Sequence, residues 1–177
     1  PESIATTEIE IKGLKAGDVA GLALLNLPYA WIGISKKGNA IELSQFDQQV
    51  NRAVIEPITT SRLWLRVHCD FDIDKAMFSY STDGTNFKNM GDSVVMPFQL
   101  RTFQGVRFTL FNFNTTGTDG GYADFNNFIV EEPRSKGLTN SIPYQKVITL
   151  MNLADSSILV NWKDFVRPVS ASDRLAQ

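Results

Sequence analysis

Three aspartates alternate in the part of the sequence that is densest in residues able to do chemistry: Asp70, Asp72 and Asp74. In a straight strand their carboxylates would share one face, as an acidic cluster for catalysis or for a metal ion requires. The segment also runs into a turn, where Asp is common because its side chain bonds the local backbone. A calcium-binding EF-hand loop is excluded, because its sixth position is Lys75 rather than Gly and its twelfth is Ser81 rather than Glu. We therefore interpret the three aspartates as turn residues.

His68 is the single histidine, so a Ser-His-Asp triad would have to use it. The sequence contains no Gly-x-Ser-x-Gly motif to supply the nucleophile, and we expect a surface or interface role for His68. Cys69 is the single cysteine, which excludes an internal disulfide. It falls on the apolar phase of its segment, and we interpret it as a core residue rather than a nucleophile.

Sugar-binding sites combine aromatic rings with a few fixed polar groups. Trp64, Arg66 and His68 alternate with apolar residues, so they should project from one face of one strand. Trp and Arg are enriched where partners bind, and we expect this face to be an interface. Asp124, beside two glycines, is a candidate ligand for a structural calcium ion, and no other cofactor is expected. The full set of carbohydrate or interface candidates is Tyr29, Trp31, Trp64, Arg66, His68, Tyr80 and Arg107.

With 177 residues, the chain has room for one domain with a sizeable core, or one domain with an appendage. A net charge of −2 gives no electrostatic case for nucleic-acid binding. No run of 18 apolar residues occurs, so no membrane-spanning helix is expected. The sequence starts at Pro1 without a signal peptide, which we interpret as a fragment or processed product of a secreted or periplasmic protein.

The elements that position these residues are short strands. Residues 62–70 alternate apolar and polar, residues 75–81 resume the alternation, and Asp83-Gly84 predicts a turn into a further strand. Residues 19–27 are apolar except for Asn26, as in a strand buried on both sides. A helix is possible over residues 41–55, but their apolar residues do not form a helical stripe. The pattern predicts an all-β, two-sheet antiparallel sandwich, and the twelve Phe residues support a thick interior between the sheets. Its predicted core includes Leu63, Leu65, Val67, Phe78, Phe108, Leu110 and Phe125.

The chain changes character after Pro133. Residues 134–137 are linker-like, and residues 146–150 and 158–162 could pair as a hairpin. We predict a β-sandwich over residues 1–133 and a C-terminal extension over residues 134–177 that packs on it as a β-hairpin appendage.

Six short motifs occur in one order and spacing along residues 4–130. Together they resemble the C-terminal, concanavalin A-like β-sandwich of glycoside hydrolase family 43 β-xylosidases and arabinofuranosidases. The motifs are Gly17–Ala23, Tyr29–Ile34, Leu63–Val67, Ala76–Gly84, Gly105–Phe108 and Gly121–Phe125 followed by Phe128. The resemblance implies a concanavalin A-like jelly roll.

In that family the catalytic carboxylates lie in a propeller domain that this sequence lacks. The resemblance therefore implies a non-catalytic accessory module of an enzyme acting on xylan or arabinan. Its partners would be the propeller of the same parent protein and a plant-derived oligosaccharide. The alternatives are a free-standing carbohydrate-binding or lectin-like module and a sandwich enzyme with a cryptic site. The family's first strands are also absent, so we expect an unpaired sheet edge at the start of the chain, covered by residues 142–162.

Overall fold

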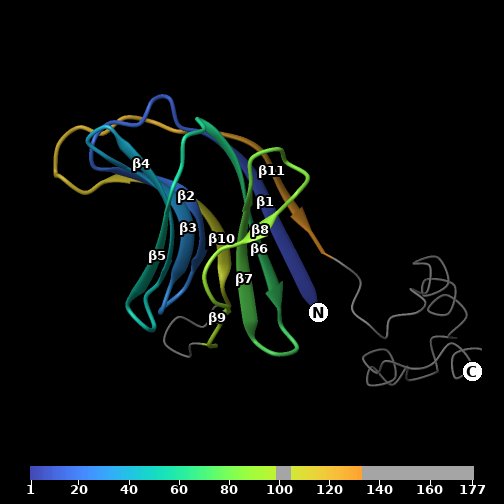
Figure 1. Ribbon diagram of the computed structural model, residues 1–177. Coiled ribbons are helices and arrows are strands. Elements are labelled where there is room, and N and C mark those ends of the chain that lie inside the picture. The colour runs from blue at the N-terminus through green and yellow to red at the C-terminus, as the bar shows by residue number, and fades with distance from the viewer. Residues whose placement is uncertain (99–104, 133–177) are drawn as a thin grey trace, which may run out of the picture. The chain divides into compact units, whose positions relative to one another are not determined.

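The computed structural model describes residues 1–98 and 105–132, and all regular structure in this part of the chain is β-strand. The strands form two antiparallel sheets around one cluster of buried side chains, which confirms the predicted sandwich (Figure 1). They are β1 (Glu2–Glu10), β2 (Asp18–Leu25), β3 (Ala30–Lys37), β4 (Ala40–Asp47), β5 (Arg52–Pro57), β6 (Arg62–Asp70), β7 (Lys75–Ser81), β8 (Lys88–Asn89), β9 (Val94–Val95), β10 (Arg107–Asn114) and β11 (Asp124–Glu131).

Each sheet brings together strands from distant parts of the sequence. Among the described residues, the first sheet has the order β11-β1-β6-β7-β8, with β9 also paired to β7, and is called sheet A. The second has the order β10-β2-β3-β4-β5 and is called sheet B. Strands β2 to β5 follow one another as a meander, whereas β10 and β11 return late in the chain, one to each sheet. The late strands thereby tie the end of the described sandwich to its beginning.

The alternation in β6 has the phase that the sequence predicts. Leu65, Val67 and Cys69 are fully buried between the sheets, whereas Trp64 and Arg66 are only partly covered on the outer side. An apolar side chain at every second position places one face of the strand in the core. The predicted core is confirmed for Leu63, Leu65, Val67 and Phe78, while Phe108, Leu110 and Phe125 are half-buried and pack against it.

The expectation of an unpaired edge at the start of the chain is wrong. β1 lies inside sheet A, with β6 on one side and β11 on the other. Ile9 stands opposite Leu63 on one neighbour and Phe125 on the other. β11 therefore supplies the second ladder partner of β1 and itself takes the edge position among the described strands of sheet A.

Residues 41–55 form no helix. Ile41 and Leu43 point inward while Glu42 and Ser44 point outward, and this two-residue period makes β4. A turn with Asn51 at a φ of 49° leads into β5, which pairs back along β4.

The phenylalanines do not mainly fill the interior. Phe78 is the one Phe that is fully buried among the described residues. Aliphatic side chains fill most of the space between the two sheets. They include Ile9, Leu22, Ile32 and Leu43. Most of the aromatic surface is consequently available on the outside of the sandwich.

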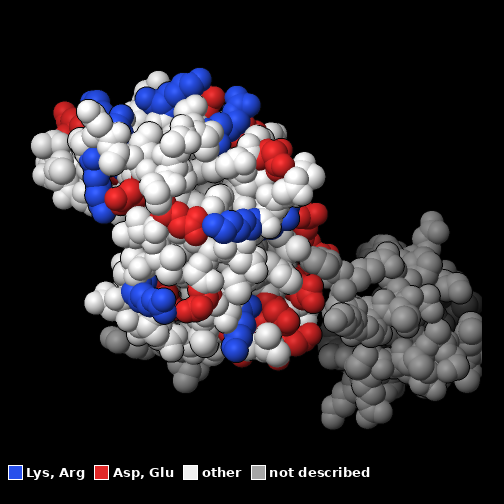
Figure 2. All heavy atoms as spheres, in the orientation of Figure 1, with Lys and Arg blue, Asp and Glu red and all other residues white. Residues whose placement is uncertain are grey.

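The predicted C-terminal extension, residues 134–177, lies outside the described residues. No helix in the described part of the chain is long and apolar enough to span a membrane. On the face shown in Figure 2, basic and acidic side chains of the described residues are interspersed, and no continuous basic area covers it. This distribution agrees with the small net charge of the chain.

Candidate functional site

The outer side of sheet B carries a row of aromatic rings, here called the aromatic face: Tyr29, Trp31, Phe46, Phe111 and Phe113. Trp31 alternates with Ala30 and Ile32, which belong to the core, so its indole points away from the other sheet. Its ring centre lies 5.7 Å from that of Phe46 and 5.6 Å from that of Phe111. Tyr29 and Phe113 extend the row at 5.8 Å from Phe46 and Phe111, respectively. These spacings are typical of interacting aromatic pairs.

Two glycines make room for the row. Gly21 and Gly33 stand directly opposite each other on β2 and β3. A Cβ on Gly33 would lie 3.1 Å from Cζ of Phe111 and 2.7 Å from the carbonyl oxygen of Ala20. The ring of Phe111 therefore lies over bare backbone and reaches across β2 to the indole of Trp31 on β3.

Sheet B has apolar side chains on both sides, as the mostly apolar run of residues 19–27 predicts. Val19 and Ala23 are buried although they lie on the outer phase of β2 and are not part of the cluster between the sheets. Other apolar side chains of the outer side stay open: Leu25 is 41% exposed, Ile55 49% and Phe113 48%. Exposed apolar side chains beside a row of aromatic rings are typical of an interaction site.

Arg107 stands at the edge of this face. It is exposed at the start of β10, directly opposite Leu25, on the same phase as Phe111 and Phe113. The structure therefore brings together three of the predicted candidates, Tyr29, Trp31 and Arg107, on the outer side of sheet B.

Trp64, Arg66 and His68 lie on the outer side of sheet A, which is here called the polar face. Arg66 places its guanidinium carbon 3.5 Å from the ring centre of Phe87 and donates a hydrogen bond from Nε to Oγ1 of Thr6 at 3.0 Å. His68 Nε2 lies 3.3 Å from Oε2 of Glu2. The three side chains share one face, as predicted, and two of them already have partners in their own chain.

The turn after β7 covers Trp64. A Cβ on Gly84 would lie 3.0 Å from the indole, so the turn backbone rests on the ring. Asp83 holds this turn, because its Oδ1 accepts hydrogen bonds from the backbone N–H groups of Thr85 and Asn86 at 2.8 Å each. These bonds, together with that from the Asn86 side chain, hold the pKa of Asp83 well below its usual range.

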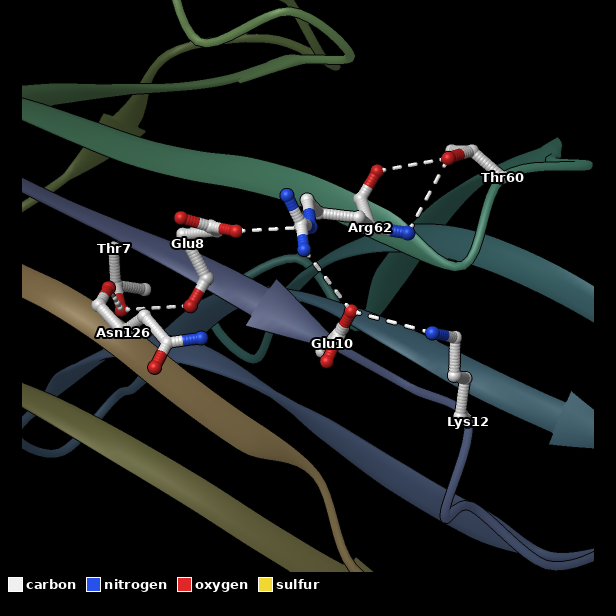
Figure 3. A network of polar contacts seen from close by, with 7 residues as sticks. All are labelled: Thr7, Glu8, Glu10, Lys12, Thr60, Arg62 and Asn126. Atoms are coloured by element: carbon white, nitrogen blue, oxygen red, sulfur yellow. Dashed lines mark hydrogen bonds and ion pairs between the residues drawn. The ribbon is translucent and has the colours of Figure 1, made fainter.

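Ion pairs continue the polar face toward one end of sheet A (Figure 3). Arg62 on β6 contacts Glu8 at 3.0 Å and Glu10 at 3.2 Å, both on the neighbouring strand β1. Lys12 approaches Glu10 at 3.6 Å. The hydrogen bond from Arg62, and then the charge of Lys12, lower the pKa of Glu10. The carboxylates here are ion-paired within the sheet.

Tyr80 lies apart from both faces. It stands opposite Leu65, on the inward phase of β7, and its hydroxyl donates to Oε2 of Glu56 on β5 at 2.7 Å. Lys88 completes the group at 3.1 Å from the same oxygen. The hydrogen bond to Glu56 raises the pKa of Tyr80, and the bonds from Tyr80 and Lys88 lower that of Glu56. This group bridges the edges of the two sheets.

Asp124 is exposed at the start of β11, opposite Glu10. Within residues 1–98 and 105–132, no three acidic, His or Cys residues are placed to hold a metal ion. Calcium binding by Asp124 stays a prediction. The turn interpretation of Asp70, Asp72 and Asp74 fits the geometry, because Asp70 accepts a hydrogen bond from the N–H of Asp72 at 2.9 Å and Asp74 has a φ of 52°.

Sequence reasoning missed Phe46, Phe111 and Phe113 as site residues. Aromatic residues in a strand look like core residues by composition alone. The available signal was that residues 108–113 carry large apolar side chains on both phases of one strand, which predicts two apolar faces.

The model for the β-xylosidase C-terminal concanavalin A-like domain matches residues 1–131. A solved structure of a bifunctional GH43-CE protein from Bacteroides eggerthii is similar to this chain with 31% identity and a TM-score of 0.70, over 76% of this chain and 18% of that one. A GH43 glycoside hydrolase engineered to display endo-xylanase and exo-arabinofuranosidase activity is similar with 25% identity and a TM-score of 0.65, over 74% and 29%.

A functionally unknown protein from Saccharomyces cerevisiae shares the fold alone, with 14% identity and a TM-score of 0.57, over 76% of this chain and 71% of that one. No curated protein matches the sequence. The chain spans less than a third of the two GH43 proteins. Since the family model covers most of the sequence, this chain belongs to the family of β-xylosidase C-terminal concanavalin A-like domains.

Proposed function

We propose that this chain is a non-catalytic accessory module of a family 43 glycoside hydrolase that acts on plant polysaccharide such as xylan or arabinan. The module docks against the catalytic domain of its parent through the aromatic face. The observation that carries this proposal is that sheet B is apolar on both sides, with Phe113 and Ile55 about half exposed on the outer one. A second apolar face is unfavourable in water and is stabilised when a partner covers it.

A protein partner fits the aromatic face better than a sugar does. Phe46, Phe111 and Phe113 have no polar atoms on their rings, and the neighbouring rings are inclined to one another rather than coplanar. A sugar platform pairs its rings with several hydrogen-bonding groups that fix orientation. Protein interfaces instead have apolar centres rich in aromatic residues, with Arg enriched, and Arg107 stands at the edge of this face.

The carboxylates support a module without its own catalysis. Glycoside hydrolysis needs one carboxylic acid whose pKa is raised, so that it can protonate the leaving oxygen. Every carboxyl pKa shift that the described residues show is downward, at Glu10, Asp18, Glu56 and Asp83. Hydrogen bonds or cations hold these groups in their charged form, which is the opposite of what a general acid requires.

A binding measurement between this chain and the separately produced catalytic domain of the parent tests the proposal. We expect saturable one-to-one binding by isothermal titration calorimetry. The double variant Ile55→Lys/Phe113→Lys should weaken it at least about a hundredfold, because two charges would be buried without partners. Ile73→Lys is the matched control, because Ile73 is 62% exposed in the turn between β6 and β7, away from the aromatic face.

Equal binding by the double variant and by wild type would contradict docking through this face. If no binding is seen but the chain is retarded by xylan or arabinan in affinity electrophoresis, and Trp31→Ala removes the retardation, the free-standing carbohydrate-binding alternative is correct. Hydrolysis of aryl xylosides or arabinosides by the pure chain would instead favour the cryptic enzyme.

A further inference from the structure

A pocket of about 180 Å³, lined by polar and apolar side chains, opens at the edge of sheet B, away from the aromatic face. One wall is the hairpin of β4 and β5, and the other is the segment around Gly91 that follows β8. The lining of the pocket includes Gln45, Asp47, Arg52, Val54, Asp92 and Ser93.

Gln45 is the unusual residue of this pocket. It lies on the inward phase of β4, two residues after the core residue Leu43, and only 4% of it is exposed. Its carboxamide has no hydrogen-bond partner among the described residues. Gly91 lies directly against the amide, since a Cβ there would collide with Oε1 of Gln45. The amide is thus open to the pocket and unpaired by the chain, so its side of the pocket favours a ligand that can both donate and accept hydrogen bonds.

The other polar groups of the pocket are close to this amide in the strand register. Asp47 stands opposite Arg52 at the end of the hairpin. One oxygen of Asp47 accepts a hydrogen bond from the N–H of Gln49 at 2.8 Å, which fixes the carboxylate. Arg52 contacts Asp92 across the opening at 3.1 Å. Carboxylates accept up to four hydrogen bonds and a guanidinium donates five, so each group retains capacity for a ligand.

The far wall is anchored in the core. Met90, Val94 and Met96, which flank the pocket segment, are all buried. The N–H of Met90 donates to the carbonyl of Phe78 at 2.9 Å, and that of Met96 to the carbonyl of Asp74 at 2.8 Å. The pocket is therefore built between two fixed elements.

We propose that this pocket binds a small polyhydroxylated ligand of the size of one sugar ring. A single buried water needs only ~10–15 Å³ on this measure, and drug-sized ligands need ~300 Å³ or more, so the volume suits a ligand of intermediate size. Hydroxyl groups donate and accept at once, which matches a carboxamide, a carboxylate and a guanidinium side by side. Val54 offers an apolar contact for the C–H side of a ring. The proposal is independent of docking through the aromatic face.

Titration of the full 177-residue chain with D-xylose, L-arabinose and, as a smaller polyol, glycerol tests this assignment. The readout is amide chemical shifts in ¹⁵N-labelled protein. We expect saturable shifts at Gly91, Ser93 and the Gln45 side chain with at least one of the sugars, and none that saturate with glycerol. Gln45→Leu should weaken binding about tenfold or more, because it removes the amide that hydrogen-bonds the ligand.

Gln49→Leu is the matched control: it makes the same chemical change at an exposed position of the same hairpin and should bind like wild type. Asp47→Asn is the second variant, should Gln45→Leu fail to fold, and it too should weaken binding. Absence of saturable shifts with both sugars, or equal binding by wild type and the folded pocket variants, would overturn the proposal and leave a pocket for water.

Discussion

Asp18 is the most deeply buried carboxylate among the described residues, only 1% exposed, and it joins two loops. Its Oδ2 accepts hydrogen bonds from the backbone N–H groups of Lys15 at 2.6 Å and Gly121 at 2.8 Å. Its Oδ1 accepts from the Asn114 side chain at 2.8 Å. Burial by itself disfavours the charge, but the donated bonds outweigh it and lower the pKa of Asp18. The residue thus fixes the loop before β2 against the loop after β10.

We predict that Asp18→Asn lowers the free energy of unfolding by ~2 kcal/mol at pH 7, as measured by urea denaturation. The new amide turns an acceptor into a donor that faces other donors, and hydrogen bonds to charged groups contribute ~1.5–3 kcal/mol. Because the folded pKa lies below the unfolded value of ~3.9, the wild-type contribution is complete above that pH and is lost as the pH falls through the folded pKa.

The difference between wild type and Asp18→Asn should therefore shrink below about pH 4. Asp119→Asn, at an exposed aspartate of the loop after β10, is the control and should leave stability unchanged. A destabilisation that stays constant down to pH 2 would show that the charge of Asp18 has no part in it.

At the scale of single residues, the sequence predicts burial correctly where the side chain belongs to a strand with regular alternation. The phase of Leu65 and Cys69 follows from alternation, and Cys69 is indeed buried, which raises the pKa of its thiol to about 12. Sequence reasoning did not identify Asp18, because the three donors of this carboxylate come from loops about a hundred residues apart in the chain as well as from its own turn. No local sequence pattern predicts that these loops lie next to each other.

The pairing of β2 with β3 depends on two glycines, which gives a prediction for these elements. Gly33→Ala should cost ~2 kcal/mol in thermal or urea unfolding, because the added methyl group meets the Ala20 carbonyl oxygen at 2.7 Å and the Phe111 ring at 3.1 Å. Tryptophan fluorescence should also change, since Phe111 lies against Trp31.

Gly105→Ala is the control for this pair of strands. A Cβ on Gly105 would meet nothing within 4 Å, and its backbone is outside the left-handed region. We expect no loss of stability there. Equal stability of Gly33→Ala and wild type would mean that Phe111 moves freely and that the aromatic face is not a fixed surface.

Strand existence was more predictable than strand order. The sequence predicts β6 and β7 because each strand has one apolar face and a turn separates the two strands. The position of β1 was not predictable, because its second partner is β11, more than a hundred residues later in the chain. The segment 41–55 was ambiguous because Phe46 and Ile55 add apolar residues on the outer phase of β4 and β5, which blurs the alternation.

At the scale of the whole molecule, the two outer faces of the sandwich differ in chemistry. Sheet A presents paired charges, such as Arg62 between Glu8 and Glu10, and its Trp64 lies under its own turn. Sheet B presents aromatic rings over a layer of small residues. The accessory role that we propose needs one face that can remain in water and one that can be covered, and the sandwich has one of each. The prediction that Trp64, Arg66 and His68 form an interface stays a prediction.

This asymmetry predicts how the isolated chain behaves at high concentration. Without a partner, the aromatic face should associate with a second copy, because exposed apolar area of this kind favours burial. We expect concentration-dependent sedimentation in analytical ultracentrifugation. The triple variant Leu25→Ser/Ile55→Ser/Phe113→Ser should remain a monomer over the same range, since it replaces three exposed large apolar side chains on the outer side of sheet B without touching the fixed pair Trp31 and Phe111. The control is Val50→Ser/Ile73→Ser, which removes apolar side chains of 63% and 62% exposure from outside the aromatic face and should associate like wild type. If the control variant dissociates the chain as well as the triple variant does, association is a general property of exposed apolar residues here, and the outer side of sheet B has no special role in it.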